Sequence, residues 1–164
     1  MKLSELTRCA LFASVALIIY SVESLVGPII PIPGFRIGLS NLVTLSALYI
    51  LGLKEALFIL AVRIILGNML TGQMMSFVYS LCGGALSFGV TAVIKRFFPK
   101  NTIWALGIIG AVLHTAGQIA CACVLFDSNA FIYYGIFLTL LSFVSGVFTG
   151  LCAQFAVKQF DRIQ

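Results

Sequence analysis

Long apolar runs, divided by short segments of glycine, proline and charged residues, take up almost the whole of the 164-residue chain. Hydrophobic residues make up 61% of the sequence and charged residues only 9%, whereas soluble domains carry about a quarter charged residues. So few charges cannot cover a water-facing surface, and a membrane-spanning helix needs about 20 apolar residues. The sequence therefore predicts an all-α integral membrane protein, a single membrane domain over residues 1–164 with no room for a soluble catalytic domain.

Turn signals between the runs predict where the helices end. We expect a bundle of six transmembrane helices, at about residues 6–26, 38–52, 55–72, 75–97, 102–126 and 130–158. With six crossings, most basic residues fall on one side of the membrane, namely Lys2, Arg8, Lys54, Lys95, Arg96, Lys100, Lys158 and Arg162. Because cytoplasmic loops carry an excess of Lys and Arg, this predicts a multi-pass protein of the cell membrane with both termini in the cytoplasm.

Polar side chains inside the apolar runs carry the strongest functional signal, because a central charge costs about 2.5–3.5 kcal/mol on insertion scales. Spacing from the nearest cytoplasmic turn puts Arg63 at a depth of about 13 Å, and His114 and Gln118 share one helix face. The candidate substrate-binding residues are Glu23, Arg36, Asn41, Arg63, Asn68, Tyr79, His114 and Gln118. They predict a polar cavity that opens outward, with Arg63 and His114 at its floor. The alternative is a set of structural pairs, such as Glu23 with Arg63.

The segment PIIPIPGFRIGLSNL, residues 28–42, interrupts the apolar sequence between the first two helices. Its three prolines make the segment stiff and leave few backbone donors to satisfy, and its glycines allow a tight turn into the second helix. We expect this segment to form a lid, with Arg36 above the mouth of the cavity.

Small residues near the start of the first helix, Ala10, Ala13 and Ser14, have two interpretations. Small side chains let helices approach closely, so this face is a candidate docking site for an external coupling subunit. Packing inside the bundle is the other interpretation, and it also accounts for Ser142, Gly146 and Gly150 in the last helix.

Reactive and metal-binding motifs do not occur in the sequence. The five cysteines lie inside apolar runs without a CxxC pair, so we interpret them as small packing residues. There is no Walker A motif, and no two acidic residues lie close together in the sequence. We therefore expect no enzyme activity, no catalytic residue, no metal site and no cofactor, and any ATP must bind to other subunits.

Four stretches carry a family resemblance: PIPGFRIGLSNLVTLSALYILGLKEA, RIILGNMLTG, SFVYSLCGGALS and HTAGQIACA. They resemble the family labelled heptaprenyl diphosphate synthase component I, also called Gx transporters, over nearly the whole chain. That family is similar to the substrate-binding S components of energy-coupling-factor (ECF) transporters, six-helix proteins with a loop over an outward cavity. Thr115 departs from the family pattern, which has asparagine at this place. The chain lacks the DDxxD motif with which prenyltransferases hold Mg²⁺ and diphosphate.

The resemblance implies a substrate-capture subunit of a vitamin-type transporter, working with a membrane coupling subunit and ATPases. Its ligand would be a small anionic or aromatic molecule, and a flavin or its precursor is one candidate. Two other functions stay open: a membrane subunit of a quinone- or flavin-linked electron-transfer system with an extracellular redox partner, and a non-catalytic membrane partner of a polyprenyl diphosphate synthase. The basic residues are scattered near helix ends, so no nucleic-acid partner is expected.

Overall fold

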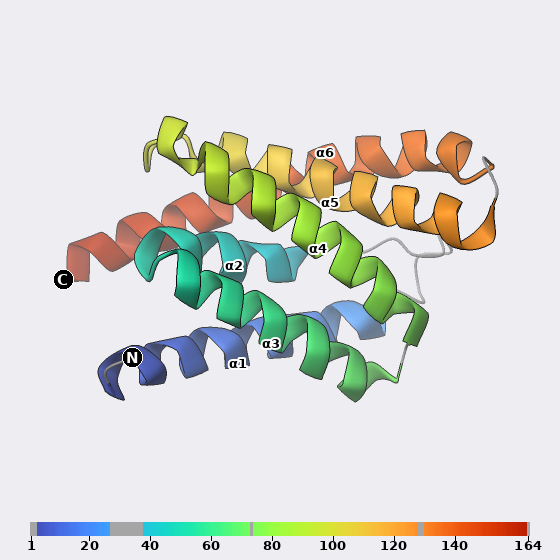
Figure 1. Ribbon diagram of the computed structural model, residues 1–164. Helices are drawn as coiled ribbons and strands as arrows, with labels where there is room; N and C mark the ends of the chain where they lie inside the picture. Colours follow the sequence, from blue (N-terminus) through green and yellow to red (C-terminus); the bar gives the residue numbers. More distant parts are fainter. Residues whose placement is uncertain (1–2, 27–37, 73, 128–129, 164) are drawn as a thin grey trace.

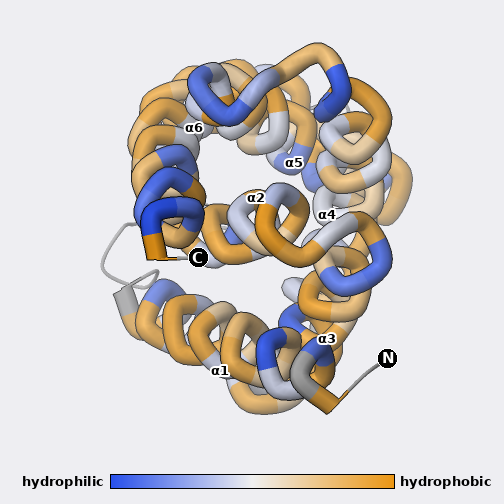
Figure 2. Tube along the Cα trace, turned by 90° about the vertical axis from the view of Figure 1, so that its left-hand side faces the viewer, coloured by the Kyte–Doolittle hydropathy of each residue, from blue (hydrophilic) through white to orange (hydrophobic). Residues whose placement is uncertain are grey.

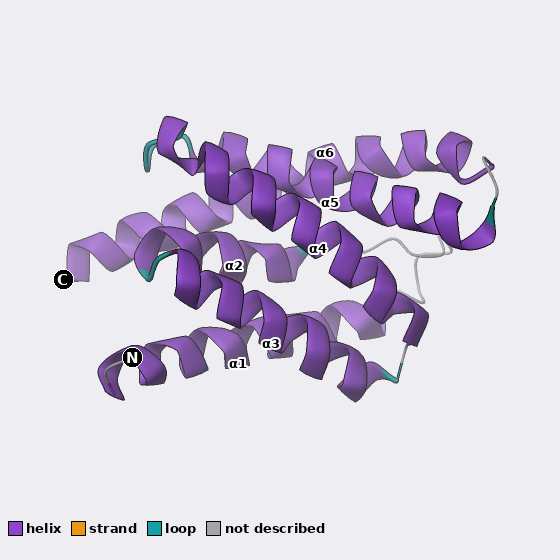
Figure 3. Cartoon of the chain, in the orientation of Figure 1, coloured by secondary structure: helices purple, strands orange, loops and turns teal. Residues whose placement is uncertain are grey.

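The computed structural model describes residues 3–26, 38–72, 74–127 and 130–163. Within these ranges the chain is helical apart from short turns, and it contains no strand (Figure 3). The elements are α1 (Leu3–Val26), α2 (Leu39–Ile50), α3 (Leu53–Thr71), α4 (Met74–Ile94), the short 3-10 helix η2 (Lys95–Phe97), α5 (Ile103–Phe126) and α6 (Ala130–Ile163). The six predicted α-helices are confirmed in order, although the last one continues to Ile163, past its predicted end at residue 158.

Among the described helices, four are long and apolar enough to cross a membrane. These segments are Glu5–Leu25, Met75–Phe97, Ile103–Phe126 and Phe131–Ile163. Helix α2 has only 12 residues, or about 18 Å at 1.5 Å per residue, against about 30 Å for the hydrocarbon core of a bilayer. The helical membrane-type fold is thus supported, whereas the count of six crossings stays a prediction.

Successive helices run in alternating directions along the bundle, and both chain ends lie at the same end of it (Figure 1). The start of α3, η2 and the end of α6 lie at this end too. These three segments carry Lys54, Lys95 and Arg162. The arrangement agrees with the predicted gathering of basic residues on one side, while the assignment of that side to the cytoplasm stays a prediction.

Helix α2 lies in the middle of the bundle, with the other helices around it (Figure 2). It contacts α1, α3, α5 and α6. Small and medium apolar side chains fill this centre, among them Ala13 and Ala16 of α1, Ala47 and Leu48 of α2, and Ile59 of α3. Many larger apolar side chains of the surrounding helices point outward, as expected for a surface that faces lipid rather than water.

Glycines allow the backbones of α5 and α6 to touch. A Cβ atom added to Gly107 would lie 2.5 Å from the Cα atom of Gly150, and one added to Gly146 would lie 2.8 Å from the Cα atom of Ile108. Close approach of this kind is the usual role of small residues between membrane helices. The structure therefore supports the packing interpretation for this stripe of α6.

The carboxyl end of α2 is held by a charged side chain from η2. Lys95 donates from Nζ to the carbonyl oxygen of Leu48 at 2.6 Å, and its ammonium group lies 5.0 Å from the centre of the Tyr49 ring. The last carbonyls of a helix have no partner within the helix, and a cation is favourable beside them. Lys95 thus serves as a C-terminal cap for a helix too short to reach both faces of a bilayer.

Candidate functional site

The amino end of α2 is held by the buried carboxylate of Glu23, which comes from the last turns of α1. Glu23 is 5% exposed. Its Oε1 accepts hydrogen bonds from the backbone amides of Gly38 and of Leu39, the latter at 3.1 Å, and its Oε2 accepts one from the amide of Ser40 at 3.3 Å. Gly38 has a φ of 76°, which glycine adopts readily. The carboxylate therefore pairs with the free N–H groups and the positive end of this helix.

Arg63 of α3 reaches the same turn of α2. It is 3% exposed, and its Nη1 donates to Ser40 Oγ at 3.0 Å and to Asn41 Oδ1 at 2.9 Å. Ser40 Oγ also lies 3.2 Å from Glu23 Oε2. Because an arginine can only donate and a carboxylate only accept, the Ser40 hydroxyl accepts from Arg63 and donates to Glu23. One serine thus links the two buried charges.

A second polar contact lies one helical turn away, between α1 and α3. Tyr20 donates from its hydroxyl to Asn68 Oδ1 at 2.8 Å, and Asn68 Nδ2 donates to the Ile64 carbonyl at 2.6 Å. A Cβ atom on Gly67 would lie 2.7 Å from the Tyr20 ring, so glycine makes room for the ring. Tyr20 is not among the predicted site residues, although its spacing of three residues from Glu23 puts both on one face of α1.

His114 and Gln118 lie at the interface of α5 with α4. A Cβ atom on Gly83 of α4 would lie 2.6 Å from the His114 carbonyl oxygen and 2.9 Å from Gln118 Cγ. The predicted shared face of these two residues is therefore the face that packs on α4. Tyr79, half-buried, lies one turn before Gly83 on the same helix.

The structure thus brings Glu23, Asn41 and Arg63 together around α2, with Asn68 nearby on α3, and brings His114 and Gln118 together against α4. Of the predicted lid, residues 28–42, the part up to residue 37, which includes Arg36, lies outside the described residues, whereas residues 39–42 form the first turn of α2. The predicted alternative of a Glu23–Arg63 pair takes the form of a linkage through Ser40.

The three residues of the candidate docking face on α1 do not all lie on the surface of the bundle. Ala10 and Ser14 are exposed, with the Ser14 hydroxyl donating to the Ala10 carbonyl at 2.9 Å. Ala13 is 6% exposed and belongs to the core cluster against α2. Its position on the inner face of α1 removes Ala13 from the surface that an external partner could touch, and leaves Ala10 and Ser14 as candidates.

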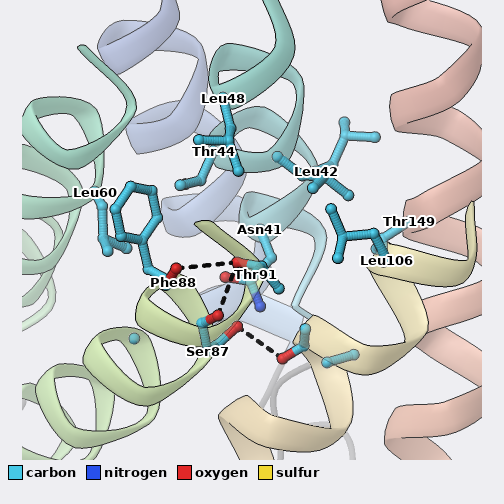
Figure 4. Close-up of a pocket in the computed structure, with 15 residues that line it drawn as sticks. Asn41, Leu42, Thr44, Leu48, Leu60, Ser87, Phe88, Thr91, Leu106 and Thr149 are labelled. Atoms are coloured by element: carbon cyan, nitrogen blue, oxygen red, sulfur yellow. Dashed lines mark hydrogen bonds between the residues drawn. The ribbon is translucent and has the colours of Figure 1, made fainter. Parts of the chain in front are cut away.

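A pocket of about 40 Å³ lies where α2 meets α3, α4, α5 and α6 (Figure 4). Of the predicted substrate-binding residues, Asn41 lines this pocket, whereas Arg63 and His114 do not. A more open hollow of about 460 Å³ lies between the ends of α3 and α4, lined by Ile65, Asn68, Met69, Gly72 and Phe77. Pockets for small molecules commonly have volumes of about 300–1,000 Å³, so only the second space has that size in this conformation.

Comparison with known proteins gives one match. The model of the family described as heptaprenyl diphosphate synthase component I matches residues 12–156. The chain belongs to this family. No curated protein matches it, and no solved structure does. Family membership and the apolar helices together fit a membrane-associated subunit, and the family name implies a partner protein, another component of a synthase.

Three of the described acidic side chains lie on three different helices, α1, α3 and α6. Glu23 contacts α2, Asp161 forms an ion pair with Lys100 at 2.6 Å, and Glu55 lies in the first turn of α3. In the described ranges, no group of three or more His, Cys, Asp and Glu side chains could hold a metal ion.

Proposed function

We propose that this protein is the membrane-embedded, ligand-capturing subunit of a transporter for a small anionic molecule. One observation carries the proposal: the guanidinium group of Arg63 and the amino end of α2 converge inside the bundle. Both carry positive charge, a full charge on Arg63 and a partial charge at the helix end. Buried ionisable residues within membrane bundles commonly mark substrate pathways.

Glu23 acts in this proposal as a resident anion. Its carboxylate receives the backbone amides of α2 and the Ser40 hydroxyl, which are the groups that would receive a carboxylate or phosphate of a ligand. Short helices whose amino ends point at anionic substrates are a recurring device in transporters. A ligand that replaces Glu23 would keep α2 capped and Arg63 paired.

The hollow lined by Asn68 and the other predicted polar residues indicate what kind of ligand could bind. The hollow beside Asn68 is mostly apolar and large enough for a ring system. Arg36, His114, Gln118 and Tyr79 would supply further polar contacts when the bundle opens. A flavin with a phosphate group combines an aromatic ring with an anion, so it is the probe that we favour.

Coupling to ATP hydrolysis would need separate subunits in the cell membrane. The exposed Ala10 and Ser14 near the start of α1 offer a surface of small side chains for that contact, because small residues let helices pack closely in a membrane.

A thermal-shift experiment tests the ligand role of Arg63. Flavin mononucleotide, which carries a phosphate, should raise the melting temperature of the wild-type protein but not of Arg63→Met. Lys158→Met removes an exposed charge on α6 and should keep the response. Riboflavin, which lacks the phosphate, should give a smaller shift. An equal shift for wild type and Arg63→Met would refute the assignment, and mass spectrometry of molecules that co-purify with the wild type extends the search beyond flavins.

The family name favours a second candidate function, that of a non-catalytic membrane partner of a prenyl diphosphate synthase. Co-expression with the catalytic component distinguishes the two functions. A synthase partner should change the rate or product length of prenyl transfer, whereas a transport subunit should leave both unchanged and support uptake in proteoliposomes with an ATP-driven module.

A further inference from the structure

Two of the five cysteines face each other where α4 packs on α5. Cys82 belongs to α4 and Cys121 to α5, and their thiol groups are hydrogen-bonded to each other. Both are free thiols in the structure. Cys123 follows Cys121 by two residues, which puts it on a different face of α5. The contact between α4 and α5 therefore contains a specific pair of thiols.

The backbones of α4 and α5 touch beside this pair. A Cβ atom added to Gly117 would lie 2.9 Å from the Cα atom of Gly83 and 3.0 Å from the carbonyl oxygen of Cys82. Gly83 follows Cys82 directly, and Cys121 lies one helical turn after Gly117, on the same face of α5. A disulfide requires Cβ atoms about 3.5–4.5 Å apart, and small residues let helices pack closely enough for such separations. The glycines thus allow the approach that a bond between the two sulfur atoms needs.

Both thiols lie inside apolar helices, near the end of the bundle opposite to the chain termini (Figure 1). Cys82 is eight residues from the start of α4 at Met74, and Cys121 is five residues from the end of α5 at Phe126. These spacings correspond to about 12 Å and 8 Å along the helices. Each side chain is half-buried, so a reagent dissolved in the lipid can reach it. The predicted topology puts this end outside the cytoplasm, where disulfides persist.

We propose that Cys82 and Cys121 are a redox modification site, where a lipid-soluble two-electron acceptor of the quinone class converts the two thiols to a disulfide between α4 and α5. Two S–H bonds break and one S–S bond forms. The two electrons and two protons that leave the thiols reduce the quinone to a quinol, so the step balances. The disulfide fixes the interface that contains His114 and Gln118 of α5. This inference does not depend on the transport function.

Peptide mapping of the full-length protein in liposomes tests the site. The wild-type protein is treated with decylubiquinone, denatured, alkylated with iodoacetamide and digested without reductant. Mass spectrometry should find two peptides joined through Cys82 and Cys121, lighter than the two reduced peptides together by two hydrogen atoms. The protein should stay a monomer on a non-reducing gel, and dithiothreitol should restore both thiols. Full alkylation of Cys82 and Cys121 after the quinone treatment would overturn the proposal.

Matched variants assign the bond. A variant in which Cys9, Cys123 and Cys152 are all replaced by alanine keeps the proposed pair, and the quinone should remove both of its thiols. Cys82→Ala should keep all of its remaining thiols after the same treatment. Retention of both thiols in the triple variant, or an equal loss of thiols in Cys82→Ala, would refute the assignment. The wild-type peptide map needs no substitution, so it decides the question if a variant fails to fold.

Discussion

At the scale of single residues, Ser40 forms hydrogen bonds with both buried charged groups, Glu23 and Arg63. Its hydroxyl accepts from Arg63 at 3.0 Å and lies 3.2 Å from the Glu23 carboxylate. Opposite charges in a low-dielectric interior stabilise only when their remaining hydrogen-bonding groups are also satisfied. The backbone amides of α2 and the side chain of Asn41 supply those further bonds.

A double-mutant cycle measures this linkage. Glu23→Gln and Arg63→Met should each lower the free energy of unfolding, by about 1–3 kcal/mol, because each leaves a buried polar group with fewer partners. The double variant should recover part of the summed loss. Denaturant titration of all four proteins gives the coupling energy, and losses that add within about 0.5 kcal/mol would contradict the linkage.

At the scale of elements, α2 depends on its neighbours at both ends. Glu23 holds its amino end and Lys95 its carboxyl end, so each charge has the sign that the helix dipole favours. An isolated helix of about 12 residues is marginal even in water. The position of α2 at the centre of the bundle therefore results from tertiary contacts rather than from the propensity of its own residues.

Removal of the carboxyl cap should destabilise the bundle. Lys95→Met loses the bond to the Leu48 carbonyl and the contact with the Tyr49 ring, and we expect a loss of about 1–2 kcal/mol. Lys158→Met, on the exposed face of α6, is the control and should change the free energy of unfolding by less than about 0.5 kcal/mol. Equal effects of the two substitutions in chemical denaturation would show that Lys95 has no capping role.

The contact of α5 with α6 gives a second element-scale prediction. A Cβ atom on Gly150 would lie 2.5 Å from the Trp104 carbonyl oxygen, so Gly150→Ala should push the helices apart and cost about 1–3 kcal/mol. At Gly89 of α4 nothing lies within 4 Å of an added Cβ. Gly89→Ala should therefore be neutral or stabilise the helix by up to about 1 kcal/mol. Comparable melting temperatures for the two variants would argue against close packing at Gly150.

At the scale of the whole molecule, the alternating helices return the chain to the end where it began (Figure 1). The basic helix ends that lie together here and the outward-facing apolar side chains agree with a bundle that lies in a bilayer. The orientation that the distribution of Lys and Arg predicts for the bundle in the membrane can be tested directly.

Cysteine labelling tests the orientation. In a background without the five native cysteines, Asn101→Cys, between η2 and α5, should react with a membrane-impermeant reagent only after the cytoplasmic side is opened. Ser128→Cys, between α5 and α6, should react in intact cells. Labelling of residue 101 from outside would contradict the predicted topology.

The sequence by itself determined the class of fold, the six helices and most of their ends, because long apolar runs and glycine or proline breaks act locally. It also selected Glu23, Asn41 and Arg63, since polar groups in hydrocarbon are costly wherever the chain places them. The periodicity of α5 likewise predicted the shared face of His114 and Gln118.

Only the tertiary structure decided which of these groups meet. Apolar residues cover both sides of membrane helices, so hydropathy does not tell which face of α1 turns inward, and Ala13 therefore looked as available as Ala10. Nor could spacing reveal that Glu23 caps α2, that Ser40 joins it to Arg63, or that Thr44 lines a pocket. These contacts link residues from different helices, and their partners are fixed by the packing of the bundle rather than by any local pattern.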